Sequence, residues 1–321
     1  MSHFPLRRRI VAPFACFLLL AASLLTARAE DSVKTLRLLT VGNSFAENAG
    51  HYMAGIASAA GYNLVLYRAN IGGASMERHW THVALHEKQA DDPKGTPFIN
   101  PATKKKEWGL KEALESAPWD YVTIQQASIN SFDSKSYQPF AKNLYDFIKQ
   151  HSPKAEVLVY ETWPYRVDDP LFAKGTESSD GMYTKLATAY RGVAKDLGAR
   201  IIPVGDAFHL AGTDPKFTFV VDKTFAAATA VYPALPDQTY SLNVGWWWKK
   251  NSTGDYKLQF DGHHANSNGE YLAGLVFVER LTGKSVVGNS FVPPGMKPEI
   301  AKALQGYAHQ AVQNIVSETH Q

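Results

Sequence analysis

Cysteine is almost absent from this sequence, since Cys16 is the single one among 321 residues. It lies in an N-terminal segment that we expect to be removed, which leaves a chain of 292 residues without any cysteine. Such a chain forms no disulfide, offers no thiol nucleophile and holds no metal through cysteine. Its stability must come from a buried core, and a chain of this length is able to build one without covalent links.

The N-terminal apolar run is too short to span a bilayer. It covers 16 residues, 10–25, whereas a spanning helix needs about 20. Three arginines precede it, and Ala27-Arg28-Ala29 follows it as a small-residue cleavage site. This order is typical of a secretory signal peptide. We expect residues 1–29 to be cleaved near Ala29 and the mature protein to be exported, either periplasmic or secreted, with no stable membrane anchor.

The expected mature chain also has no excess of basic residues. The full sequence carries a net charge of +3, but residues 1–29 contain four of its 33 basic residues and no acidic one, so the remainder carries −1. Nucleic-acid binding usually needs a basic face, and we expect no such partner. No repeat or linker divides the rest, so residues 30–321 are expected to form one domain. Residues 216–258 read as an irregular insertion that could act as a lid, and residues 297–318 as a C-terminal helix.

Short apolar strands alternate with helical patterns along the mature chain. Strand-like segments cover residues 36–41, 63–69, 119–126, 155–163 and 199–205. This alternation predicts an α/β fold, a three-layer α/β/α sandwich with a mostly parallel, flavodoxin-like sheet of about five strands. Residues 91–108 are expected to form a loop or an exposed hairpin. Ligands of such folds bind beyond the carboxyl ends of the strands.

Candidate catalytic and binding residues follow several of these strands. They are Ser44 after the first, Gly73 after the second, Gln125 and Gln126 after the third, and the spaced pair Asp261 and His264 before a late helix. Ser44 has two interpretations, a nucleophile at a strand end or a helix N-cap, for which serine is favoured. A serine, an Asp/His pair and amide donors are the components of an acyl-transfer site.

Several segments resemble the SGNH (GDSL-like) hydrolase superfamily, and more closely an uncharacterised bacterial branch of it. They are "VGNSF", "GGASMERHW", "WDYVTIQQAS", "ETWPYR", "IIPVGDAF" and "DGHHANSNGEYLAG", which span most of residues 36–283. The resemblance implies that Ser44 is the nucleophile, His264 the general base and Asp261 the acid that orients it. It also implies that the N–H groups of Ser44 and Gly73 bind the oxyanion, with no cofactor and no metal.

The sequence departs from the superfamily pattern in two places. Asn43 stands where the pattern has an aspartate, and the third block lacks its "GxND" asparagine. Gln126 or Gln125 could supply the third oxyanion hydrogen bond, with Asn130 as another candidate. Alternatively, the two glutamines only satisfy buried backbone at the end of a strand.

The aromatic segments allow two interpretations each. Trp163 and Arg166 follow the fourth strand, where they either hold substrate or pack against the strand end. The run "GWWWKK" at 245–250 is either a lid whose rings stack on a sugar or a hydrophobic plug that holds down a long loop. Lys104, Lys105 and Lys106 are expected to form a solvated loop.

The remaining histidines favour structural roles. His79, His82 and His86 share one face of a helix, but no glutamate completes a zinc-hydrolase pattern. We therefore expect no metal site there. His263 lies at the wrong spacing from Asp261 to act as the base, and we expect it to form a pocket wall or an exposed ring.

Together these features predict an exported serine hydrolase acting on a small-molecule or polysaccharide ester, with O-acetyl groups on carbohydrate as the favoured substrate. The alternatives are an acyltransferase using the same serine, a non-catalytic carbohydrate-binding protein of the same fold, and a metal-dependent phosphoesterase. The sequence does not give the oligomeric state.

Overall fold

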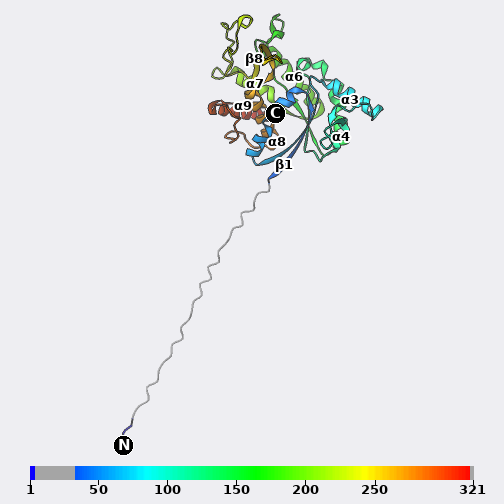
Figure 1. Cartoon of the computed structure of the whole chain (residues 1–321). Coiled ribbons are helices and arrows are strands. Elements are labelled where there is room, and N and C mark those ends of the chain that lie inside the picture. Colours follow the sequence, from blue (N-terminus) through cyan, green and yellow to red (C-terminus); the bar gives the residue numbers. More distant parts are fainter. Residues whose placement is uncertain (4–32, 319–321) are drawn as a thin grey trace. The chain divides into compact units, whose positions relative to one another are not determined.

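A parallel sheet forms the centre of the fold, with five strands in the order β2-β1-β5-β6-β7 (Figure 1). The strands are β1 (Lys34–Gly42), β2 (Tyr62–Asn70), β5 (Tyr121–Ile124), β6 (Glu156–Glu161) and β7 (Arg200–Pro203). All neighbouring pairs are parallel. The central strands are buried along most of their length because helices cover both faces, which explains their near-continuous apolar sequences.

The structure is a computed structural model that describes residues 1–3 and 33–318. Residues 4–29 of the expected signal peptide lie outside the described residues, so its cleavage remains a prediction. Within the described residues, no helix is long and apolar enough to cross a membrane.

Helices form a layer on each side of the sheet (Figure 1). One layer contains α1 (Ser44–Gly50), α2 (Met53–Ala59), α7 (Val204–Thr213), α8 (Ser267–Thr282) and α9 (Pro298–Glu318). The other contains α3 (Met76–Lys88), α4 (Leu110–Glu115), α5 (Phe140–His151) and α6 (Ser179–Leu197). Short 3-10 helices lie at Ser128–Asn130, Ser134–Ser136, Pro170–Phe172 and Ala227–Thr229. The predicted three-layer sandwich is thereby confirmed.

Helix α8 is buried on almost every side, as its run of apolar residues requires. It begins at a side-chain cap, where Asn266 Oδ1 accepts the N–H groups of Asn268 and Gly269. It ends at Gly283 in the left-handed conformation, which glycine adopts without strain. Because His264 lies two residues before the cap, this buried helix start holds the end of the preceding strand in place.

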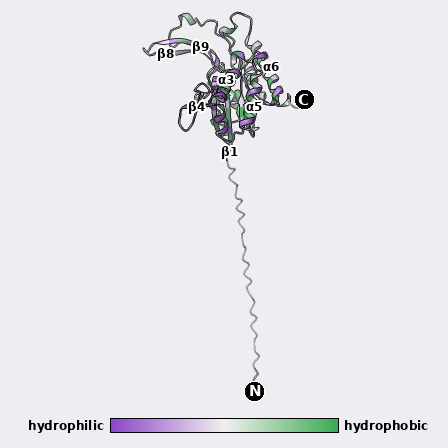
Figure 2. Cartoon of the chain, turned by 90° about the vertical axis from the view of Figure 1, so that its right-hand side faces the viewer, coloured by the Kyte–Doolittle hydropathy of each residue, from purple (hydrophilic) through white to green (hydrophobic). Residues whose placement is uncertain are grey.

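Two antiparallel hairpins extend the fold. Strands β8 (Asn243–Lys250) and β9 (Tyr256–Ala265) project from the body of the domain, on the side where β3 (Phe98–Ile99) and β4 (Lys106–Trp108) also lie (Figure 2). The hairpin alternative for residues 91–108 is therefore confirmed. The prediction that 216–258 is irregular is wrong over its second half, because three consecutive tryptophans conceal the period-two pattern of a half-exposed strand. Helix α7 was also not predicted.

Candidate active site

Ser44 follows β1 at the carboxyl edge of the sheet, but it is not the helix cap. The cap of α1 is Asn43, whose Oδ1 accepts the N–H of Phe45 at 3.0 Å. The Ser44 Oγ instead lies 2.8 Å from Nε2 of His264. The capping interpretation of Ser44 is wrong, since its hydroxyl makes its hydrogen bond across the site.

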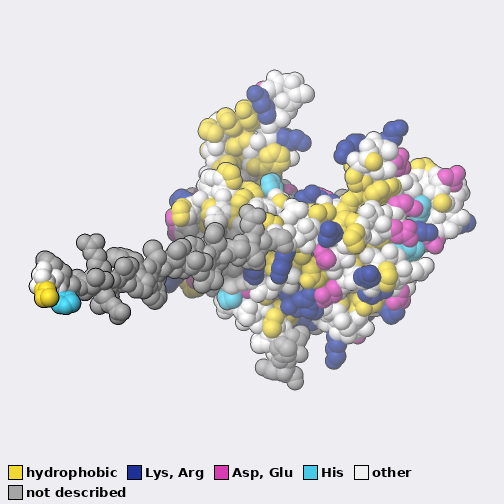
Figure 3. All heavy atoms as spheres, turned by 90° about the horizontal axis from the view of Figure 1, so that it is seen from below, with side chains coloured by type: hydrophobic (Ala, Val, Ile, Leu, Met, Phe, Trp, Pro, Cys, Tyr) yellow, Lys and Arg dark blue, Asp and Glu magenta, His cyan; other side chains and the backbone are white. Residues whose placement is uncertain are grey.

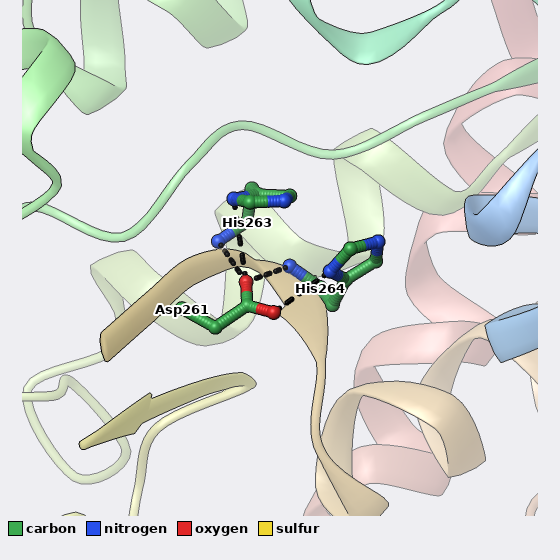
Figure 4. Close-up of side chains that lie close together, drawn as sticks. All are labelled: Asp261, His263 and His264. Atoms are coloured by element: carbon green, nitrogen blue, oxygen red, sulfur yellow. Dashed lines mark hydrogen bonds and ion pairs between the residues drawn. The ribbon is translucent and has the colours of Figure 1, made fainter. Parts of the chain in front are cut away.

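His264 and Asp261 come from the end of β9 and complete a chain of hydrogen bonds (Figure 4). The His264 Nδ1 lies 2.8 Å from Asp261 Oδ2. The other carboxylate oxygen, Oδ1, accepts the backbone N–H groups of His263 and His264 at 3.1 and 2.9 Å. These bonds fix the carboxylate, which accepts from Nδ1 and so leaves Nε2 of His264 as the acceptor for the serine hydroxyl.

The electrostatics of this strand end keep Asp261 ionised. Partial burial raises the pKa of its carboxyl group. The hydrogen bonds from the ring and backbone of His264, together with the charges of both histidines, outweigh burial and hold the pKa well below its ordinary value. A carboxylate that stays charged is able to stabilise an imidazolium formed on His264.

Asn43 links the serine to the loop after β2. Its Nδ2 donates to the carbonyl of Ala74 at 3.0 Å, and its Oδ1 also accepts from Gln125 Nε2 at 2.9 Å. The side chain is buried. Asn43 therefore ties the Ser44 segment to the Gly73 segment and is a positioning residue in the site.

A cavity of about 210 Å³ opens beside the serine. It is lined by Asn43, Ser44, Phe45, Gly73, Ala127, Ser128, Ile129, Tyr165, His263 and His264. Gly73 has a φ of +64°, which favours glycine. Within residues 33–318, the backbone N–H groups of Ser44 and Gly73 donate no hydrogen bond to the protein. Both are thus available to a ligand oxygen.

The two glutamines do not line this cavity. Gln126 Oε1 accepts the N–H groups of Met76 and Ala127, and its Nε2 donates to Ser136. Gln125 donates to Asn43, and both glutamine side chains are buried. The prediction that Gln125 or Gln126 donates to an oxyanion does not fit these positions, and the backbone-satisfying alternative fits Gln126. Asn130 is likewise not among the lining residues.

Trp163 lies beneath the site and is completely buried. Its ring stacks between Phe45 and Phe208, at centroid distances of 4.4 and 4.7 Å. Its Nε1 donates to the carbonyl of His263 at 2.8 Å. The prediction that Trp163 contacts substrate is inconsistent with this burial. Trp163 instead supports the strand end that carries His264.

Arg166 also has a structural position. It is buried and forms two hydrogen bonds with the carboxylate of Asp168, and its Nη1 donates to Gln238 at 2.6 Å. Its backbone N–H donates to the carbonyl of Gly262 at 2.8 Å. Arg166 therefore anchors the long loop and the base of the hairpin.

Two hydroxyl groups and a second histidine complete the cavity wall. Ser128 Oγ and Tyr165 Oη lie 2.9 Å apart. The exposed part of His263 borders the same space, and burial lowers its pKa, which favours a neutral ring. The wall position predicted for His263 agrees with this arrangement. Sequence reasoning missed Tyr165, whose only signal was its place beyond the end of β6.

Two clusters of side chains carry potential metal ligands. Asp261, His263 and His264 offer ligand atoms within 4.8 Å of one another, but these atoms already bond to each other and to Ser44. The rings of His79, His82 and His86 bond to Gly42, Lys94 and Glu112 respectively. Among the described residues, these three histidines form no common ligand group.

Replacing Asn43 with aspartate tests its positioning role. In Asn43→Asp, an oxygen faces the carbonyl of Ala74 in place of the Nδ2 donor, so the Gly73 segment should loosen relative to Ser44. We expect kcat for a small ester at pH 8 to fall about tenfold to a hundredfold with little change in KM, as for partial loss of oxyanion stabilisation. Full activity in a normally folded variant would contradict this role.

Buried His79 should make stability fall in mild acid. Burial lowers its pKa from 6.5 to about 4, while Nε2 bonds to the carbonyl of Gly42 at 2.8 Å and Nδ1 has no partner among the described residues. Between these two pH values the unfolded chain binds the proton more strongly than the folded chain. The contribution of neutral His79 to the free energy of unfolding is therefore complete above pH 6.5 and is lost as the pH falls toward 4. The expected loss is about 3 kcal/mol.

Urea unfolding at pH 7 and pH 4 measures this effect, with His79→Gln as the matched variant that lacks the titrating ring. The wild type should lose more stability than the variant over this range. Equal losses would show that His79 does not titrate as expected.

Comparisons with known proteins give one family match and several similar solved structures. The family model described as "Domain of unknown function (DUF4886)" matches residues 37–226. A crystal structure of a DUF4886 family protein from Bacteroides uniformis is similar at 24% identity, covering 87% of this chain and 95% of that one, with a TM-score of 0.67. A candidate SGNH hydrolase from Slackia heliotrinireducens is similar at 21% identity, covering 77% and 98%, with a TM-score of 0.46. No curated protein matches the chain.

Proposed function

The chain belongs to the DUF4886 family, and from its site we propose that it is an exported serine hydrolase that cleaves carboxylic esters. One observation carries the proposal. Ser44 Oγ, the His264 ring and the Asp261 carboxylate form a continuous chain of hydrogen bonds, each of 2.8 Å, at the wall of a cavity. This order is that of a nucleophile, a general base and a group that orients the base.

In the first step, Ser44 Oγ attacks the ester carbonyl carbon and its proton passes to His264 Nε2. Asp261 stabilises the imidazolium through Nδ1. The carbonyl oxygen becomes an oxyanion and accepts hydrogen bonds from the free N–H groups of Ser44 and Gly73. The tetrahedral intermediate then breaks its bond to the alkoxy oxygen, which leaves as the alcohol with the proton from His264.

In the second step, water attacks the acyl-enzyme. His264 Nε2 takes a proton from the water, and the same two N–H groups bind the new oxyanion. Collapse of this intermediate releases the carboxylic acid and returns the proton to Ser44 Oγ. The chemistry uses residues of this chain alone.

The shape of the cavity favours a small acyl group. Its volume is about 210 Å³, and Ala127, Ile129 and Phe45 provide apolar wall beside the serine. We propose short O-acyl groups such as acetyl as the substrate.

The proposal is tested with p-nitrophenyl acetate and purified mature protein. We expect hydrolysis that EDTA leaves unchanged and that phenylmethylsulfonyl fluoride stops. Mass spectrometry of the inhibited protein should place the sulfonyl group on the peptide containing Ser44. Activity lost to EDTA, or inhibition with the label on another residue, would refute the serine mechanism.

Export is a separate part of the proposal. Protein recovered from the periplasm or medium of an expressing bacterium should begin at Glu30, after the expected cleavage site. Recovery of only uncleaved protein, retained in the cytoplasm, would refute it. N-terminal sequencing measures the outcome.

A further inference from the structure

The β8–β9 hairpin presents two faces, because paired residues of an antiparallel ladder project to the same side. Trp246 pairs with Phe260 and Trp248 with Leu258 on one face. Trp247 pairs with Gln259 and Lys249 with Lys257 on the other. The three adjacent tryptophans are thus divided between two surfaces.

The face of Trp246 and Trp248 is covered by the long loop that precedes the hairpin. Trp246 contacts Phe225, and Trp248 contacts Tyr232 and donates from Nε1 to the carbonyl of Ala234 at 3.0 Å. Gln238 of the same loop bonds to the backbone N–H and carbonyl of Trp246. Trp246 and Trp248, two of the three tryptophans, therefore form the hydrophobic plug that was one of the two interpretations of this segment.

The opposite face leads into the site. Strand alternation places Lys257, Gln259 and Asp261 on one side of β9, with Trp247 beside Gln259. Trp247 is 39% exposed, and Lys249 and Lys257 are exposed as well. From Lys257 to Asp261 the strand covers about 13 Å. A strip of one aromatic ring and two ammonium groups therefore ends at the proposed catalytic residues.

This strip has features that folding alone does not favour. Like charges placed directly opposite each other on a ladder are destabilising, and Lys249 faces Lys257. The acidic residue of the hairpin turn, Asp255, bonds to Thr253 and to the amide of Asn251. A ligand that carries negative charge would relieve the repulsion between the lysines, and a flat apolar surface would cover the Trp247 ring.

The surrounding surface gives such a ligand room. Two projections carry hydrophobic and basic side chains, and the surface between them is hollowed (Figure 3). The other hairpin, β3–β4, contributes Lys104, Lys105 and Lys106 at its turn and edge. Basic side chains therefore occur on both hairpins of this side of the domain.

We propose that the strip formed by Trp247, Lys249, Lys257 and Gln259 binds an acidic polysaccharide and delivers its O-acyl groups to Ser44. A sugar ring stacks on Trp247, and the lysines pair with carboxylates of uronic acid units. This inference rests on the proposed ester hydrolysis. It adds that the physiological substrate is an anionic O-acetylated glycan.

The experiment compares acetate release from O-acetylated polygalacturonate with release from the same polymer after its carboxyl groups have been reduced to alcohols. Wild type should prefer the acidic polymer, and added salt should weaken the preference. Trp247→Ala should lower kcat/KM on the acidic polymer about tenfold. The double change Lys249→Gln and Lys257→Gln should remove the preference between the polymers.

The matched control is Lys250→Gln, which changes an exposed lysine of the same strand that projects to the face opposite the strip, near the ring of Tyr256. It should leave both polymer activities unchanged. All variants should hydrolyse p-nitrophenyl acetate like wild type, and loss of the lysine repulsion should leave the melting temperature of the double variant unchanged or raised.

The outcomes separate the two proposals. A wild type inactive on p-nitrophenyl acetate refutes the hydrolase itself. A wild type active on that ester, with no preference for the acidic polymer or with equal loss in the Lys250→Gln control, refutes the glycan strip alone. Binding of the inactive Ser44→Ala protein to anionic lipid vesicles, but not to polygalacturonate, would also refute it.

Discussion

Replacing Ser44 with alanine is expected to lower kcat for p-nitrophenyl acetate by about 10⁴-fold or more, because the variant has no nucleophile to form an acyl-enzyme. Stability should hardly change. The Ser44 hydroxyl bonds to His264, and the helix cap is supplied by Asn43. Steady-state kinetics and thermal unfolding of the same preparation measure the two effects.

The combination of results distinguishes the two roles considered for this serine. A capping serine would show the reverse pattern, with a stability loss of about 1 kcal/mol and normal activity. Ser44→Cys is an informative second variant, since it keeps a nucleophile at the same position. Activity of Ser44→Ala equal to wild type would exclude the serine mechanism.

Replacing Asp261 with asparagine is expected to lower kcat about 10³- to 10⁴-fold. The amide removes the charge that stabilises the imidazolium, and its NH₂ group favours the His264 tautomer with the proton on Nε2. In that tautomer Nε2 cannot accept the serine proton. The protein should still fold, because Oδ1 of the amide is able to accept the two backbone N–H groups that Asp261 Oδ1 now accepts.

His263 provides the control for this prediction. It lies beside the same carboxylate, with Nδ1 3.3 Å from Asp261 Oδ1, yet it is outside the chain from Ser44 to Asp261. His263→Asn should change kcat by less than about tenfold, as expected for a wall residue. A larger loss of kcat in His263→Asn than in Asp261→Asn would contradict the assignment of His264 as the base.

The sequence by itself determined the architecture and the chemical inventory of the site. Strands of four to nine residues with apolar runs, separated by helical patterns, specify a parallel sheet because buried strands and amphipathic helices have different periods. The order of the segments then predicts that Ser44, Gly73 and the Asp261–His264 pair share one sheet edge, and the structure brings them together.

The tertiary structure decided which polar and aromatic groups face the cavity. Gln125 reaches Asn43 across 82 residues of sequence, and Gln126 reaches Met76 across 50. Trp163 stacks on Phe45 and supports a carbonyl 100 residues away. Local sequence patterns do not predict such contacts, because a side-chain amide or an indole N–H forms a hydrogen bond equally well with a buried protein group or with a ligand.

The tryptophans of β8 show the same division. The sequence showed the aromatic run but allowed two interpretations of it, a hydrophobic plug or a surface on which a sugar stacks. The pairing register with β9 and the loop over one face assigned Trp246 and Trp248 to the plug and left Trp247 exposed. Composition and period thus determine the fold and its inventory, while the direction in which each side chain points depends on long-range packing that only the folded chain defines.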